Sequence, residues 1–317
     1  MKVYVSVDME GIGGISHSRP TERGDSGYPA AVALMVGEAN AAIAGAFDGG
    51  ATEVLVNDSH GQMFNLAPED VDARAVLLQG QKPWSMVAGA GPDQGFAVAL
   101  FVGYHTRAGH PIGTIAHTYS GTPTLTTLQG RPVGESGINA LALGAWGVPV
   151  GLVTGDDQLA LETDLWFPWA EQVIVKSAVS RRAAASVHPS VARERVRAGA
   201  KRAVERAAAG ELKVFEPGRP ITLEAEYENA GQADHAAIVP GAERYGDRGV
   251  RVVTDDPVAA YRTFLAGVRL AVARTAVDVH AAGVLGQELR RQADIHLDHP
   301  PGMDLLGHPD VGTYLSE

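Results

Sequence analysis

The 317-residue sequence contains no cysteine, which excludes disulfide bonds and zinc sites built on thiolates. Any metal must therefore be bound by histidine, aspartate, glutamate and water. Basic residues are also scarce, since 26 lysines and arginines stand against 37 aspartates and glutamates and give a formal net charge of −11. This balance argues against nucleic acids and anionic membranes as partners, and it is compatible with cationic ligands or metal.

The sequence also lacks two features of exported and membrane-bound proteins. No stretch approaches about 18 consecutive apolar residues, the length that a membrane span needs. Residues 1–4 lead directly into a strand pattern instead of the apolar core of a signal peptide. Hydrophobic residues make up 45% of the chain, which is enough for the core of one large or two modest domains. We therefore expect a soluble, cytoplasmic protein.

Strand and helix patterns alternate over the first 215 residues. Short apolar runs predict buried strands, and segments with apolar residues at helical spacing predict helices. The expected strands are 3–7, 52–56, 75–79, 96–104, 113–117, 148–154 and 172–179, and the expected helices are 28–48, 84–88, 134–146 and 190–209. This alternation indicates a largely parallel sheet flanked by helices. We therefore expect a catalytic α/β domain over residues 1–215.

The pattern changes after residue 215, where prolines and glycines mark a break in composition. Strand patterns at 221–227 and 250–254 and a helix pattern at 257–275 then predict a smaller α+β subdomain over residues 216–276. The pattern loosens over residues 277–317, a segment that holds four of the eleven histidines. We expect this segment to form an extended C-terminal tail that packs at a subunit interface.

Two carboxylates, Asp8 and Glu10, lie at the end of the first predicted strand. Residues two apart on a strand share a face, so both side chains point the same way. Two like charges this close are unfavourable unless a positive charge lies between them. The pair fits a role as metal ligands, although a strand that ends in a polar turn explains this stretch equally well when it is taken alone.

Further candidate ligands follow other predicted elements. They are Asp58 and His60 after strand 52–56, His105 after strand 96–104, His117 at the end of strand 113–117, and Glu135 after a predicted hairpin at 125–133. Because ligands bind at the carboxyl ends of strands in an open α/β sheet, we expect these side chains at one edge. A single histidine after a strand is more often structural, but recurrence at one edge favours a metal site.

This set of ligands limits the choice of metal. Carboxylates and imidazoles without thiolates suit catalytic Zn²⁺ or Mn²⁺, and a bridging carboxylate allows two metal ions. For Asp58 two roles are open, namely orienting the imidazole of His60 and capping the turn that follows.

Five motifs in the same order resemble the zinc-dependent D-aminopeptidases of the DppA type. The motifs are SVDMEGIGGI, EVLVNDSHG, FVGYH, AHT and RPVGESGINA, and the resemblance extends from about residue 1 to about residue 275. It implies a site with about two zinc ions per subunit. Asp8 would bridge the ions, with Glu10, His60, His105 and Glu135 as the other ligands and His117 at the position of the catalytic histidine. It also implies a homo-oligomer, a decameric ring with internal active sites.

These observations predict a metal-dependent aminopeptidase that hydrolyses short peptides or amino-acid amides. The preference for an N-terminal D-residue comes from the resemblance. The alternatives are a related metal-dependent amidohydrolase with an L- or β-amino substrate and a non-catalytic protein that binds metal or small molecules. His117 favours an enzyme, because a binding protein needs no proton shuttle. We expect it to act as an acid and base, since metal hydroxide already supplies a nucleophile.

Overall fold

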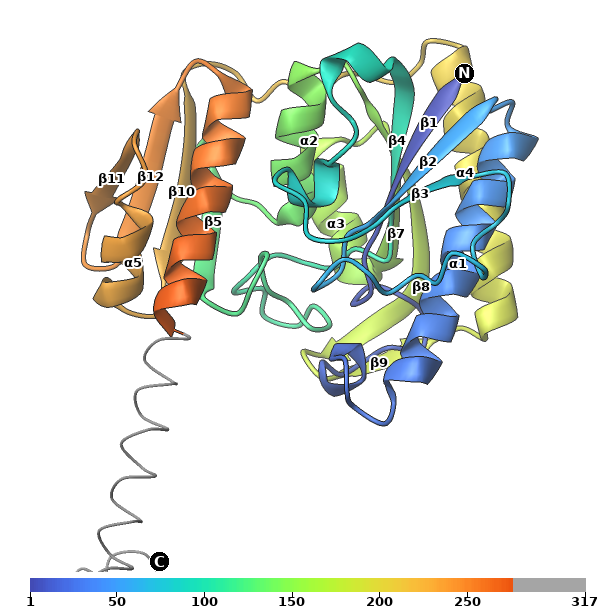
Figure 1. The fold of residues 1–317 in the computed structure, drawn as a ribbon, viewed down its shortest axis with the longest axis horizontal. Helices are drawn as coiled ribbons and strands as arrows, with labels where there is room; N and C mark the ends of the chain where they lie inside the picture. Colours follow the sequence, from blue (N-terminus) through green and yellow to red (C-terminus); the bar gives the residue numbers. More distant parts are fainter. Residues whose placement is uncertain (276–317) are drawn as a thin grey trace, which may run out of the picture.

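A seven-stranded sheet forms the larger part of the protein in the computed structural model, which describes residues 1–275 (Figure 1). The strand order is β3-β2-β1-β4-β7-β8-β9. The strands are β1 Lys2–Val7, β2 Glu53–Asp58, β3 Val76–Leu78, β4 Phe96–Val102, β7 Val150–Asp156, β8 Glu171–Ser180 and β9 Ala183–Ser186. All pairs are parallel except β8 with β9. The predicted α/β class with a largely parallel sheet is confirmed, and the predicted 277–317 tail lies outside the described residues.

Helices cover both faces of this sheet, and the side chains of β1 alternate between the two hydrophobic cores. Val3, Val5 and Val7 pack into the core formed with α1 (Tyr28–Asp48) and α4 (Pro189–Ala208). Tyr4 points to the other core, which includes α2 (Glu135–Ala145) and α3 (Asp157–Trp166). A strand buried on both faces has the continuous apolar sequence that made β1 and β4 predictable.

Helix α1 corrects the expectation that no segment is long and apolar enough to cross a membrane. It has 21 residues and a hydropathy of 1.6, so by length and composition alone it could cross a membrane. In the fold, its residues Ala39, Ala42, Ile43 and Ala46 are fully buried in the core shared with α4 and the sheet. These contacts are those of a core helix.

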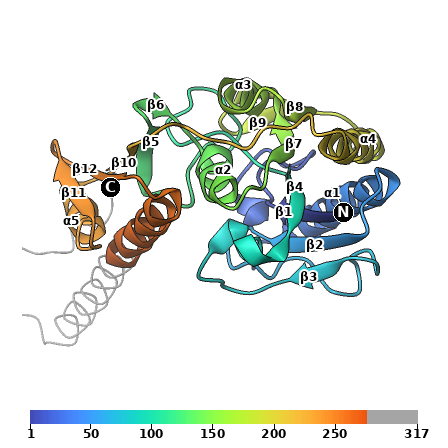
Figure 2. The same ribbon diagram turned by 90° about the horizontal axis from the view of Figure 1, so that it is seen from above.

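A second, antiparallel sheet lies to one side of the first (Figures 1 and 2). Its order is β11-β12-β10-β5-β6, with β5 Pro123–Leu128, β6 Arg131–Pro132, β10 Ile221–Tyr227, β11 Ala242–Tyr245 and β12 Gly249–Thr254. Helix α5 (Ala230–Ala236) and a helix that begins at residue 257 and runs to 275 accompany it. The predicted hairpin is confirmed as β5 and β6. The predicted 216–276 unit therefore shares its sheet with residues 123–132.

The 257–275 helix connects the two parts. The Tyr261 ring stacks on Trp84 at 6.3 Å and its hydroxyl donates to the Trp84 carbonyl, while Phe264 packs edge-on against Tyr119 at 5.9 Å. Trp84 precedes the short 3₁₀ helix η2 (Ser85–Val87); the other two such helices in residues 1–275 are η1 (Arg19–Thr21) and η3 (Pro92–Gln94).

Two glycines of α1 allow a direct test of its packing against α4. A Cβ on Gly45 would lie 2.2 Å from the Arg197 carbonyl oxygen, whereas a Cβ on Gly37 would meet mainly the flexible Arg193 side chain at 3.1 Å. We expect Gly45→Ala to lower the free energy of unfolding by about 1–3 kcal/mol. Gly37→Ala should leave it unchanged or raise it by up to about 1 kcal/mol, because alanine favours the helix. Urea denaturation measures both, and equal effects would contradict this packing.

Candidate active site

Three neighbouring strands, β2, β1 and β4, end at the candidate site. Asp8 directly follows β1, with Glu10 two residues later; His60 and His105 follow β2 and β4, and Glu135 is the first residue of α2. All five side chains are buried, with at most 9% of any residue exposed. The structure thus brings together the five predicted metal ligands at the carboxyl edge of the sheet.

The carboxylate of Asp8 faces two different imidazoles. Its Oδ1 is 3.3 Å from His60 Nδ1, and its Oδ2 is 3.4 Å from His105 Nε2. Asp8 Oδ2 and His105 Nε2 are both buried without a hydrogen-bond partner within residues 1–275. A buried acceptor beside a buried imidazole nitrogen, neither of them satisfied, is the arrangement expected where a cation binds between them.

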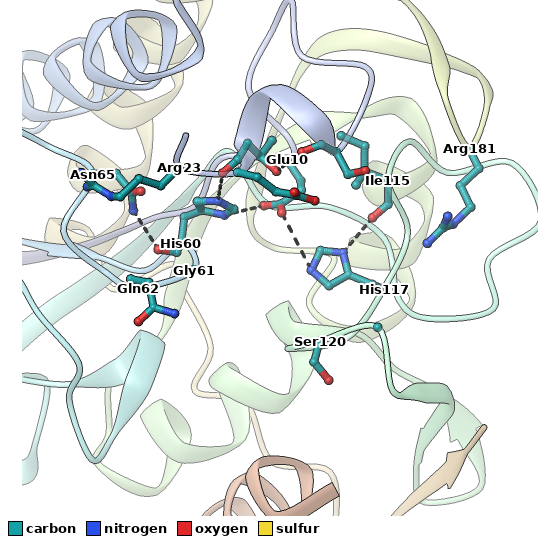
Figure 3. Close-up of a pocket in the computed structure, with 14 residues that line it drawn as sticks. Glu10, Arg23, His60, Gly61, Gln62, Asn65, Ile115, His117, Ser120 and Arg181 are labelled. Carbon is teal, nitrogen blue, oxygen red and sulfur yellow. Dashed lines mark hydrogen bonds and ion pairs between the residues drawn. The ribbon is translucent and has the colours of Figure 1, made fainter. Parts of the chain in front are cut away.

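Glu10 and Glu135 complete two groups around Asp8. Glu10 Oε2 lies 2.9 Å from His60 Nδ1, and Glu135 Oε1 lies 3.3 Å from His105 Nε2. Each imidazole therefore faces one glutamate of its own, and both imidazoles face Asp8. His117 Nε2 lies between the groups, 4.0 Å from Glu10 Oε1 (Figure 3) and 3.9 Å from Glu135 Oε1.

Backbone carbonyls fix the orientation of all three imidazoles. His60 Nε2 donates to the Thr21 carbonyl at 2.9 Å, and His105 Nδ1 donates to that of Thr106 at 2.9 Å. His117 Nδ1 likewise donates to a carbonyl, that of Ile115, at 2.8 Å. These partners assign a proton to the outer nitrogen of each neutral ring, so that the inner nitrogen presents a lone pair to the cluster.

The cluster requires positive charge. Burial and the charge of Glu10 raise the pKa of Asp8 to about 7. Burial lowers the pKa of His105, but the carboxylates of Glu135, Asp8 and Glu10 outweigh it and raise that pKa to about 10. In the absence of an ion, protonated imidazoles would thus compensate the carboxylates. A divalent cation meets the same need, and three carboxylates with inward imidazole nitrogens fit such a cation.

The segment that carries His117 is not the predicted strand. Residues 113–117 form an irregular loop, in which Ile115 has φ 53°. A positive φ is strained for a β-branched residue, and no strand accommodates it. The Ile115 N–H donates to the Arg181 carbonyl at 2.8 Å, which takes the place of a partner in a sheet. The prediction of a strand at 113–117 was wrong, and His117 reaches the site from a loop.

His117 is set up for proton transfer. Its ring stacks on His105 with centroids 4.0 Å apart. Burial, with the charge of His105, lowers the pKa of His117 from its ordinary value. The imidazole is therefore neutral near pH 7 and able to accept a proton.

Asp58 has one of the two roles left open by the sequence. Its carboxylate accepts hydrogen bonds from the backbone N–H groups of Asn65 and Leu66 and from the Asn65 side-chain amide. It therefore caps the turn after β2. Its effect on His60 is indirect, because the same Asn65 amide also donates to the His60 carbonyl.

A cavity of about 560 Å³ opens onto the cluster (Figure 3). Glu10, His60 and His117 form part of its wall, together with Arg23 and Arg181. A small molecule in this cavity therefore has access to two of the predicted ligands and to the candidate proton-transfer group.

Comparison with known proteins identifies the family. The family model of the M55 peptidases, described as D-aminopeptidase, matches residues 1–266. The chain belongs to the M55 family of D-aminopeptidases. The D-aminopeptidase of Bacillus subtilis (strain 168) is 39% identical over 279 residues, which cover 86% of this chain and 98% of that protein. The solved structure of the zinc-dependent D-aminopeptidase DppA from Bacillus subtilis, a self-compartmentalizing protease, matches with a TM-score of 0.79 and 37% identity, again over 86% and 98% of the two chains.

The resemblance drawn from the sequence motifs is thereby confirmed.

The structure adds one functional group that the sequence did not predict, the buried ammonium of Lys176. Lys176 on β8 is fully buried, and its ammonium donates to the carbonyls of Glu10, Ile12 and Ile15. It holds the turn that presents Glu10. One feature of the sequence could have indicated its role: Lys176 is the only charged residue in the predicted strand 172–179.

Replacing Lys176 tests whether its ammonium holds the turn that contains Glu10. We expect Lys176→Met to lower the free energy of unfolding by about 3 kcal/mol or more, because buried carbonyls lose their donor. Lys201→Met is the matched control; Lys201 is exposed on α4 beside Glu205 and should change stability by no more than about 0.5 kcal/mol. Urea denaturation in chelator separates this effect from metal binding. A Lys176 variant as stable as the control would contradict the role.

Proposed function

We propose that the protein is a zinc-dependent aminopeptidase that removes an N-terminal D-amino acid from short peptides or amino-acid amides. The observation that carries this proposal is the Asp8 carboxylate, whose two oxygens face two imidazoles, each with its own glutamate. This is the geometry expected of a carboxylate that bridges two metal ions. Membership of the D-aminopeptidase family supports the reaction and the D-selectivity.

Five residues would hold about two zinc ions. His60 and Glu10 would hold one ion, His105 and Glu135 would hold the other, and Asp8 would be shared between them. Zinc in such a site polarises a carbonyl oxygen and lowers the pKa of water toward about 7.

The protein supplies substrate binding and proton transfer. The free α-amine of a peptide is a cation, and the cavity wall includes Glu22, an acidic residue outside the proposed ligand set that attracts it. His117 Nε2 takes a proton from the attacking water and returns it to the nitrogen of the leaving amine. The neutral state that burial favours for His117 suits this exchange.

We also propose that the chain assembles into a homo-oligomer, a decameric ring with internal active sites. The description of the Bacillus subtilis DppA as a self-compartmentalizing protease supports an assembly of this kind.

Metal dependence and stereochemistry are tested together. We expect elemental analysis of protein expressed with zinc to find about two zinc ions per subunit. D-alanyl-D-alanine should be hydrolysed faster than L-alanyl-L-alanine, chelator should abolish the activity, and added zinc should restore it. Protein without zinc, or hydrolysis that persists in chelator, would contradict the proposal. Preference for the L-peptide would contradict the D-selectivity alone.

The role of His117 is tested by substitution. His117→Ala should lower kcat by about 10²–10⁴-fold, the usual contribution of a general acid and base. Its zinc content and melting temperature should match those of the wild type. His235→Ala, on α5 of the second sheet, is the control and should retain full activity. Loss of zinc from the His117 variant would show that His117 is a ligand instead.

A further inference from the structure

Two arginines give the cavity positive charge away from the carboxylate cluster. Arg23 and Arg181 both line it, and Figure 3 shows them on opposite sides, with Glu10 and His117 between them. Neither arginine belongs to the proposed metal site. Each donates one side-chain hydrogen bond to a backbone carbonyl, and the two arginines differ in what lies beside the guanidinium.

Arg23 lies against two aromatic rings and beside an acidic residue. Its Nη2 donates to the Phe64 carbonyl at 2.7 Å, and its guanidinium lies 4.2 Å from the centre of the Phe64 ring and 5.3 Å from that of Tyr28. Its neighbour Glu22 also lines the cavity and carries the opposite charge. This side of the cavity is therefore unfavourable for an anion.

Arg181 is anchored beside His117 with most of its guanidinium unused. Its carbonyl accepts from the Ile115 N–H at 2.8 Å, and its Nη2 donates to the Ala116 carbonyl at 3.2 Å. Within residues 1–275 no carboxylate lies at ion-pair distance from it, unlike Arg197 and Arg202, which pair with Asp48 and Glu171. A guanidinium has five N–H donors in a fork that matches a carboxylate.

We propose that Arg181 binds the C-terminal carboxylate of a di- or tripeptide substrate; this rests on the proposed aminopeptidase function. The N-terminal residue of the peptide lies at the cluster of proposed ligands and its carboxylate at Arg181. Arg181 contacts the residue directly before His117, and an extended chain spans about 3.3–3.6 Å per residue. A peptide of two or three residues therefore reaches both ends, and the protein selects short free peptides over their C-terminal amides.

The test compares D-alanyl-D-alanine with D-alanyl-D-alanine amide on the zinc-loaded enzyme. The wild type should favour the free acid in kcat/KM by about 10- to 100-fold, as expected for a charge-assisted bond. Arg181→Gln should abolish this preference by raising KM for the free acid, with kcat and the amide reaction little changed. Arg181→Lys should restore part of it, because lysine keeps the charge without the fork.

Arg182→Gln is the matched control. Arg182 is the exposed neighbour of Arg181 and does not line the cavity, so this variant should behave as the wild type. Equal losses on both substrates in Arg181→Gln, or no preference for the free acid in the wild type, would overturn the proposed subsite while the aminopeptidase function stands. Hydrolysis of neither peptide by the wild type would overturn both.

Discussion

Three carboxylates, Asp8, Glu10 and Glu135, are buried together at the carboxyl edge of the seven-stranded sheet. Like charges at this spacing repel, and burial adds the cost of removing each from water. The fold tolerates them because the imidazoles of His60 and His105 face them at 2.9–3.4 Å. Divalent cations would satisfy the same requirement with two charges each. The need for positive charge at this one point explains why the inner nitrogens point inward and the outer nitrogens donate to backbone carbonyls.

The backbone holds these groups in fixed relation. The Gly11 N–H donates to the Gly103 carbonyl at 2.7 Å, which ties the turn after β1 to the segment after β4. The approach is so close that a Cβ on Gly11 would lie 1.8 Å from the Tyr104 carbonyl oxygen. Glycine is therefore required there by space. Because Glu10 and His105 lie beside this contact, the two segments that carry them after β1 and β4 are held close together by backbone groups.

The sequence predicted the strand ends because buried parallel strands are short apolar runs, after which Asp8, His60 and His105 stand out. It did not predict what depends on distant partners. The five-stranded sheet pairs β10 with β5, segments far apart in the chain, and no local pattern encodes that choice. Helix α3 was missed because it begins directly after β7: Asp156 is both the last residue of that strand and the N-cap, whose carboxylate accepts from the N–H groups of Gln158 and Leu159. The strand ends supplied the candidate residues, and the family resemblance separated the five expected ligands from Asp58 and His117.

Dependence on a distant partner also explains why the strand predicted at residues 113–117 is a loop. Ile115 has φ 53°, a strained conformation that costs about 1–3 kcal/mol and persists only when its surroundings enforce it. Its N–H donates to the Arg181 carbonyl and its carbonyl accepts from His117 Nδ1, each at 2.8 Å. Ile115 therefore contacts both the ring of His117, through its carbonyl, and the backbone of Arg181, through its N–H. The proton-transfer group and the proposed carboxylate subsite are therefore linked through Ile115 and through the hydrogen bond from Arg181 Nη2 to the Ala116 carbonyl, which is how a segment without regular structure can hold both in place.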